Sequence, residues 1–175
     1  MLPYLSYLST TVLGLVHGPP SLSLTAVTGR NNTSVFECWQ LTSPFTKTAG
    51  ADVLRMGDIA NASYYSIPPR IDGGRHPGPA KQYIWVISGL MHMSLPNATD
   101  EVIVHGGRYG LMYIDDTADV SAGGHRSMFP GDDETILLMI PVRGGINPPH
   151  WVLYDGPCRI GAAPVGTGEW TPLDP

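Results

Sequence analysis

The chain has 175 residues, a formal net charge of −5 and a hydrophobic fraction of 42%, which fit one folded domain with a packed core. Its 10 Lys and Arg residues form no basic cluster, which argues against a nucleic-acid-binding protein. No uninterrupted apolar run reaches the length of about 18 residues that a transmembrane helix needs.

The first segment, residues 1–20, differs from the rest of the chain. It is apolar up to Val16 and is then broken by His17-Gly18-Pro19-Pro20. This pattern partly resembles a secretory signal, but basic residues are missing from its start, so a first strand of the domain is the alternative. We treat residues 1–20 as a signal-like or strand segment that precedes the domain.

Short strands are expected along most of the remaining chain, because segments rich in β-branched and aromatic residues alternate with Gly, Pro, Asn and Asp. Gly89 marks a tight bend between two of these segments. Residues 50–57 are the one segment that could form a short helix. The expected strands are 35–41, 60–67, 82–88, 90–95, 101–105, 109–114, 135–141 and 150–154.

This pattern predicts an all-β fold, either a sandwich or a small barrel, in a single domain. The 21 glycines and 17 prolines agree with it, because short strands need many tight turns. We assign residues 21–158 to the β-barrel domain. We expect residues 159–175 to pack on it as an irregular C-terminal strap.

Asn-x-Ser/Thr sequons favour passage through the secretory pathway, with N-glycosylation, although a cytoplasmic location stays open as the alternative. They overlap in the run Asn31-Asn32-Thr33-Ser34 and recur twice further along the chain. The candidate glycosylation sites are Asn31, Asn32, Asn61 and Asn97.

Cys38 and Cys158 are the only cysteines. In an oxidising compartment they would pair and close a loop of about 120 residues, which stabilises the fold by restricting the unfolded chain. In a reducing compartment they would be two buried free thiols. Neither a CxxC pair nor a Cys/His cluster indicates zinc binding or redox chemistry.

The acidic clusters Asp115-Asp116 and Asp132-Asp133-Glu134 lie in expected turns. We interpret them as solvated loop ends, because paired carboxylates for glycoside hydrolysis would have to lie on strands that face a groove. No nucleophile-elbow pattern supports a Ser-His-Asp triad.

Two spacings in the chain resemble the motifs of the cupin family. The first motif, H-x-H-x3-E-x6-G, falls on His76, Gly78, Gln82 and Gly89, and Pro130-Gly131-Asp132 resembles the turn of the second, whose histidine position is Thr135. The resemblance implies an all-β, single-domain, cupin-like jelly roll or β-barrel. The alternative is an unrelated barrel with a chance match.

The same positions argue against the metal chemistry of catalytic cupins. A cupin metal is held by three histidines and one glutamate, and here these positions read His, Gly, Gln and Thr. We therefore expect a metal-free protein that uses no cofactor.

An apolar barrel interior, rich in Met and aromatic residues, suits a hydrophobic, oxygenated small molecule. The alternative is that these residues form an ordinary hydrophobic core and line no ligand cavity. The candidate substrate-binding residues are Tyr65, Ile84, Met91, His92, Tyr109, Tyr113, His125 and Met139.

A narrower resemblance lies in the blocks Gly89-Leu90-Met91-His92, Gly106 to Leu111, Gly124-His125, Pro130-Gly131-Asp132, Pro148-Pro149-His150 and Leu153 to Cys158. These blocks resemble small secreted fungal proteins that include hetero-Diels–Alderases, which join humulene-type sesquiterpenes to tropolone o-quinone methides. The resemblance implies a cofactor-free pericyclase of secondary metabolism that acts by positioning its substrates and by hydrogen bonding to the quinone-methide carbonyl. We expect His76 and Gln82 to be the catalytic donors, with His92 or Tyr113 as substitutes. A non-catalytic secreted module that binds a hydrophobic small molecule is the alternative function.

The alternation along residues 82–88 also predicts a homodimer. If Gln82, Ile84 and Val86 face the interior, then Tyr83, Trp85 and Ile87 face outward. Large apolar side chains on an outer face favour pairing of that sheet with a second copy.

Overall fold

The computed structural model describes residues 21–96 and 99–159, and strands make up most of these ranges. The larger sheet contains, in spatial order, β13 (His150–Asp155), β2 (Thr33–Pro44), β1 (Ser21–Arg30), β10 (Leu111–Ile114), β7 (Gln82–Ser88), β12 (Thr135–Pro141) and β5 (Ser63–Ile67). The smaller sheet contains β6 (Ile71–His76), β11 (His125–Phe129), β8 (Leu90–Ser94) and β9 (Glu101–His105). A separate hairpin joins β3 (Thr46–Thr48) to β4 (Ala51–Val53), and η1 (Arg143–Gly145) is a single 3-10 turn.

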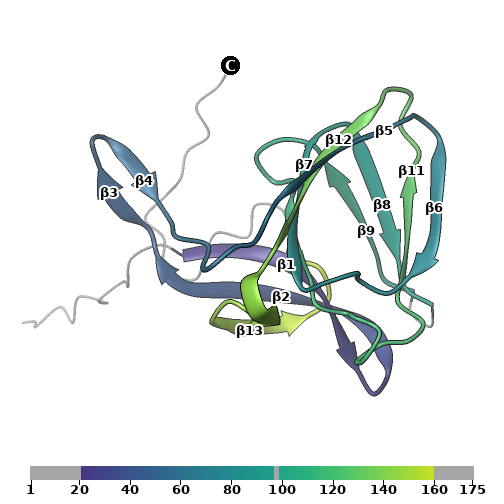
Figure 1. Cartoon of the computed structure of the whole chain (residues 1–175), viewed down its shortest axis with the longest axis horizontal. Helices are drawn as coiled ribbons and strands as arrows, with labels where there is room; N and C mark the ends of the chain where they lie inside the picture. Colours follow the sequence, from purple (N-terminus) through teal and green to yellow (C-terminus); the bar gives the residue numbers. More distant parts are fainter. Residues whose placement is uncertain (1–20, 97–98, 160–175) are drawn as a thin grey trace, which may run out of the picture.

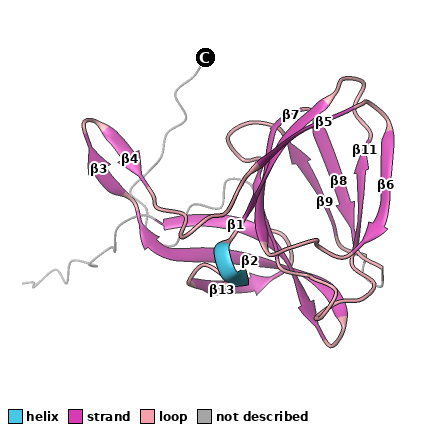
Figure 2. Ribbon diagram, in the orientation of Figure 1, coloured by secondary structure: helices cyan, strands magenta, loops and turns pink. Residues whose placement is uncertain are grey.

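The expected all-β, barrel-like architecture is confirmed by how the two sheets face each other. In Figure 1, β5, β7 and β12 form one wall of a barrel, and β6, β8, β9 and β11 form the opposite wall. The coloring in Figure 2 shows strands throughout both walls and the β3–β4 hairpin extending away from them. Within the described residues, no helix has the length and apolarity needed to cross a membrane.

Most expected strands are present, and β7, β9 and β12 have the expected bounds. Residues 50–57, the one segment that could have formed a helix, do not form one: Ala51–Val53 is β4, in a hairpin whose two turn residues, Ala49 and Gly50, both have positive φ. This is the geometry of the two-residue turns that join antiparallel strands. Four strands, β1, β3, β6 and β11, were not expected, because their serines, threonines, glycines or charged residues give a weak strand signal. Residues 1–20, residues 160–175 and the Asn97 sequon lie outside the described residues.

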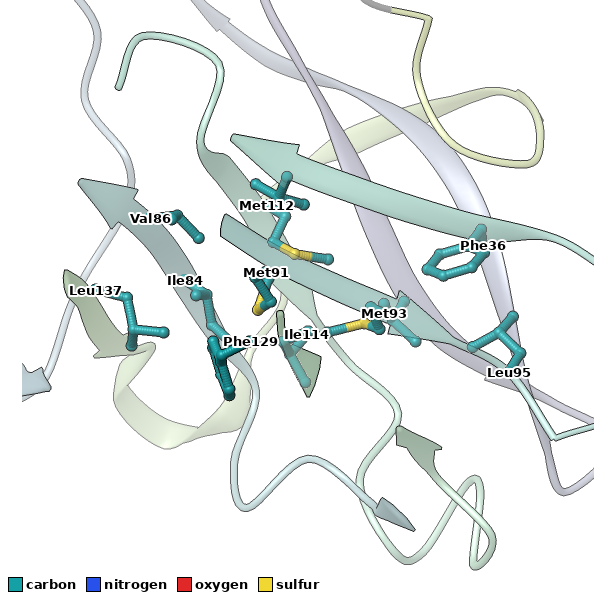
Figure 3. Close-up of a cluster of buried hydrophobic side chains, with 12 residues drawn as sticks. Phe36, Ile84, Val86, Met91, Met93, Leu95, Met112, Ile114, Phe129 and Leu137 are labelled. Carbon is teal, nitrogen blue, oxygen red and sulfur yellow. The ribbon is translucent and has the colours of Figure 1, made fainter. Parts of the chain in front are cut away.

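The space between the two sheets is filled by a hydrophobic core, which Figure 3 shows in close-up. Met91, Met93 and Met112 each expose 1% or less of their surface. Ile84 belongs to the same cluster, and Met139 packs against it. The expectation that Ile84, Met91 and Met139 line a ligand cavity is therefore corrected, because they pack against other side chains instead.

A second core lies on the opposite face of the larger sheet, and it corrects the expected exposure of Tyr83, which does lie on that face. This side chain is fully buried, because the segment that contains Leu54 and Met56 crosses over it, and its hydroxyl donates to the Met56 carbonyl oxygen at 2.9 Å. Trp85 and Ile87 are exposed, at 41% and 42%.

The homodimer stays a prediction, and light scattering tests it. The wild type should be a dimer and Trp85→Lys a monomer, because the charged side chain would weaken the apolar contact. A monomeric wild type would contradict the prediction.

A disulfide joins Cys38, in the middle of β2, to Cys158, which follows β13. The two Cα atoms are 4.6 Å apart, and 120 positions separate the residues in sequence. Because β13 is the last strand at its edge of the sheet, the bond ties the end of the described chain to the N-terminal hairpin.

Candidate functional site

Two consecutive carboxylates follow β10 directly, at the end of the barrel where the chain leaves the larger sheet. Asp115 is 7% exposed and Asp116 is 0% exposed, so the interpretation of this pair as a solvated loop end is wrong. Side chains along a strand alternate between its faces, and the two aspartates continue this alternation. They therefore enter two different polar networks.

The Asp116 network connects the two sheets. Its Oδ2 accepts a hydrogen bond from Ser34 Oγ at 2.6 Å and lies 2.8 Å from His125 Nδ1. Ser34 Oγ also lies 2.8 Å from Ser121 Oγ. The serine thus contacts the carboxylate and not the imidazole, which differs from a nucleophilic triad, where the serine contacts the histidine. This network stabilises the barrel end.

The Asp115 network lies on the outer side. Its Oδ2 accepts hydrogen bonds from Thr28 Oγ1 at 3.1 Å and Asn147 Nδ2 at 2.9 Å, and its Oδ1 lies 2.8 Å from Lys81 Nζ. Tyr113 donates to Asn147 Oδ1 at 3.2 Å. Burial, and then the nearby Asp115 charge, raise the pKa of Tyr113, so it stays a neutral donor. The carboxylate is therefore held in one orientation, and it forms an ion pair with the ammonium of Lys81.

A surface depression of about 680 Å³ opens beside this network. Its lining comes from residues 77–81, residues 117–119, Val142 and Gly145, most of which present aliphatic or backbone surface. Polar groups come from Lys81, Thr117 and Asp119. Thr117 Oγ1 donates to Asp119 Oδ1 at 2.5 Å, and this bond lowers the pKa of Asp119, so that the carboxyl is ionised. The depression thus combines apolar walls with one cation and one anion.

The expected catalytic pair, His76 and Gln82, has two separate environments. His76 is exposed; its Nδ1 lies 3.1 Å from the carbonyl oxygen of Pro77, and its ring meets that of His125 edge-on at 4.9 Å. Gln82 is 2% exposed, and its amide donates to Met139 Sδ at 3.8 Å. The two side chains share no partner, so the geometry does not support a joint role.

The cupin-like motif positions do not converge either. Gln82 pairs with Pro141 at one end of β12, whereas Thr135 begins the other end of that strand. Six residues of strand separate the two positions by about 20 Å. The Thr135 hydroxyl bonds to the backbone N–H and carbonyl of Leu90. Among residues 21–96 and 99–159, no group of three or more His, Cys, Asp or Glu is placed to hold a metal ion.

Gly78, at the second histidine position of the first cupin motif, has a packing role. A Cβ atom at Gly78 would lie 2.5 Å from Ile114 Cγ2. Its N–H donates to the Asp116 carbonyl oxygen at 3.0 Å, which closes the end of the barrel next to the depression. Only glycine allows this close approach.

The remaining candidate substrate-binding residues are dispersed. Tyr65 and Tyr109 are 41% and 63% exposed, so the expectation that they line the interior is wrong. Tyr65 lies on edge strand β5, and Tyr109 lies in the turn before β10, where the Arg108 guanidinium is 5.6 Å from its ring. His92 Nε2 is 2.8 Å from Glu101 Oε2. These residues therefore form no single site.

Sequence reasoning missed the roles of Lys81, Asp115 and Asp119. The one available signal is the position of Asp115-Asp116 directly after the apolar run 111–114, because a carboxylate next to a buried strand end needs donors. Nothing in the sequence indicates that residues 77–81 and 117–119 meet.

Comparisons with known proteins give no matching family model and no matching curated protein. One similar solved structure is a mutant of the 3,4-ketoisomerase QdtA from Thermoanaerobacterium thermosaccharolyticum in complex with TDP-4-keto-6-deoxyglucose, with 11% identity over 63% of this chain and 80% of that chain and a TM-score of 0.37. Another is the capsular polysaccharide assembling protein CapF from Staphylococcus aureus, with 17% identity over 77% of this chain and 34% of that chain and a TM-score of 0.36. At these values neither similarity bears on substrate or activity.

Proposed function

We propose that this protein is a cofactor-free enzyme of fungal secondary metabolism that catalyses an intermolecular hetero-Diels–Alder addition. Its substrates would be a tropolone o-quinone methide and a humulene-type sesquiterpene, the pair implied by the resemblance of the sequence blocks. The observation that carries the proposal is Lys81, a cationic donor fixed 2.8 Å from Asp115 at the wall of a depression with mostly aliphatic lining.

The reaction needs no redox partner and no leaving group. The methide carbon bonds to one carbon of the alkene, the carbonyl oxygen bonds to the other, and all atoms and electrons of both reactants remain in the product. Electron density moves toward the carbonyl oxygen as these bonds form. A cationic N–H directed at that oxygen stabilises the transition state more than the ground state. The apolar walls hold the two reactants together and exclude water, which competes for the methide carbon.

Lys81 fits this role better than the expected donors, His76 and Gln82. An ammonium group has three N–H donors, and the ion pair with Asp115 leaves donors for a ligand. The Gln82 amide is buried against Met139, and His76 lies next to its own neighbour's carbonyl. Lys81 lines the depression itself.

Replacing Lys81 with Met should lower kcat by about 10- to 150-fold, the effect of losing one hydrogen bond from a charged donor. Lys47→Met is the matched control, because Lys47 forms its own ion pair with Asp52 at 3.1 Å on the separate β3–β4 hairpin. The assay follows product formation and diastereomer ratio against the spontaneous reaction. No acceleration by the wild type contradicts the proposed activity, and an unchanged kcat in Lys81→Met removes this residue from it.

A non-catalytic binding module for a hydrophobic small molecule is the second candidate. The observation that favours it is that side chains fill the barrel interior, whereas the depression beside Lys81 is open to a ligand. Saturable binding of either substrate, without acceleration of the reaction, would select this function.

We also propose that the protein passes through the secretory pathway and carries N-glycans. Asn31 and Asn32 form the exposed two-residue turn between β1 and β2, and Asn61 is exposed before β5. Loss of mass after glycosidase treatment of protein made in a eukaryotic host would test this, and an unchanged mass would contradict it.

A further inference from the structure

We infer that the depression recognises a neutral vicinal hydroxy-ketone on an apolar ring, with Lys81 binding the carbonyl oxygen and Asp119 binding the hydroxyl group. This inference deepens the proposed function and rests on it for the choice of ring, because the tropolone substrate carries such a pair of oxygens.

Two opposite charges line one depression, and each is paired with a different residue. Lys81 begins the segment that leads into β7, and Asp119 lies in the loop after β10. The ammonium of Lys81 is paired with Asp115 at 2.8 Å, and the Asp119 carboxylate accepts its bond from Thr117 at 2.5 Å. Each charge therefore has its own partner on its own side.

Both charges have a partner that restricts their orientation. Thr28 and Asn147 orient Asp115 by hydrogen bonds, and the Asp115 Oδ1 atom forms an ion pair with the ammonium of Lys81. The Thr117 hydroxyl, two positions away, orients Asp119 and lowers its pKa, and the charge of Lys81 contributes to the same lowering. Such pre-oriented groups lose little entropy when a ligand binds.

A cation and an anion on one apolar surface select the chemical class of the ligand. An anionic ligand would be attracted by Lys81 and repelled by Asp119, and a hydrocarbon would leave both charges without a ligand partner. A neutral group with a carbonyl acceptor next to a hydroxyl donor satisfies both side chains at once. Pro77, Pro79 and Val142 offer apolar contacts to the ring that carries it.

Calorimetric titration with tropolone and tropone tests the inference, at a pH below the pKa of tropolone so that both ligands are neutral. Tropone has the carbonyl and lacks the hydroxyl group. The wild type should bind tropolone about tenfold more tightly, the value of one hydrogen bond to a charged acceptor. Asp119→Ala should reduce this preference to about twofold or less, whereas Lys81→Met should weaken the binding of both ligands.

Asp52→Ala is the matched control, because Asp52 is likewise paired with a neighbouring side chain, on the β3–β4 hairpin away from the depression. It should keep the preference of the wild type. Equal affinities of the wild type for the two ligands, or an undiminished preference in Asp119→Ala, would overturn the inference. A preference for tropolone without any rate acceleration would contradict the proposed function alone, and acceleration without a preference would contradict this inference alone.

Discussion

Asp116→Ala should lower the free energy of unfolding by about 2–6 kcal/mol, because two buried polar groups lose their acceptor at a cost of about 1–3 kcal/mol each. The substitution leaves the Ser34 hydroxyl and the His125 ring nitrogen without their shared acceptor, at a position with 0% exposure. Urea unfolding of wild type and variant measures the effect through the shift of the midpoint at a constant slope.

Two further variants separate the buried network from carboxylate loss in general. Asp116→Asn can keep an oxygen at the place of Oδ2, and it can put its amide group at the place of Oδ1, which has no partner among the described residues. It should therefore lose less stability than Asp116→Ala. Asp132→Ala removes an exposed carboxylate paired with Arg70 and should barely move the midpoint. An Asp116→Ala midpoint equal to that of Asp132→Ala would show that the network contributes nothing.

Removing the disulfide has the second large effect. The double substitution Cys38→Ala with Cys158→Ala should destabilise the fold by about 4–5 kcal/mol, because the loop it opens is about 120 residues long and the unfolded chain gains entropy. Thermal or urea unfolding of the variant, and of the wild type with and without a reducing agent, measures it. The oxidised wild type should also show no free thiol when denatured.

The reduced wild type serves as the control for packing, since it keeps both sulfur atoms and lacks only the bond. It should lose nearly as much stability as the double variant, because Cys38 is a small buried side chain in either form. A loss below about 1 kcal/mol in both would mean that the sheet pairing of β13 with β2 holds this region without the bond.

The strands with a strong local signal were predictable, and those that depend on their neighbours were not. Residues 82–88 are rich in Ile and aromatic residues and residues 135–141 in Ile and Leu, and both form strands inside the larger sheet as expected. By contrast, β6 contains Gly73-Gly74 next to charged residues, and it is a strand because its backbone pairs with β11. Local composition carries no information about that pairing.

The candidate site was also only partly predictable from local sequence patterns. The alternation along β7 correctly placed Gln82, Ile84 and Val86 on the inner face, but it could not show that Leu54 and Met56 cover Tyr83 on the other face. Lys81 and Asp119 come together only through the strand pairings and the loop after β10. Contacts between residues far apart in sequence depend on the whole fold, and a single sequence gives no pattern for them.

The position of the β1–β2 hairpin has a consequence for synthesis on the ribosome. The hairpin is local in sequence and can form early, yet its two flanking strands are β10, which pairs in parallel with β1, and β13, which pairs with β2. Both are made much later, so the emerging chain exposes two unpaired strand edges while most of the domain is translated. Unpaired edges promote association with other chains. Assembly of this protein is therefore completed from its C-terminal part, and a chain that stops before residue 150 would retain the open edge of β2.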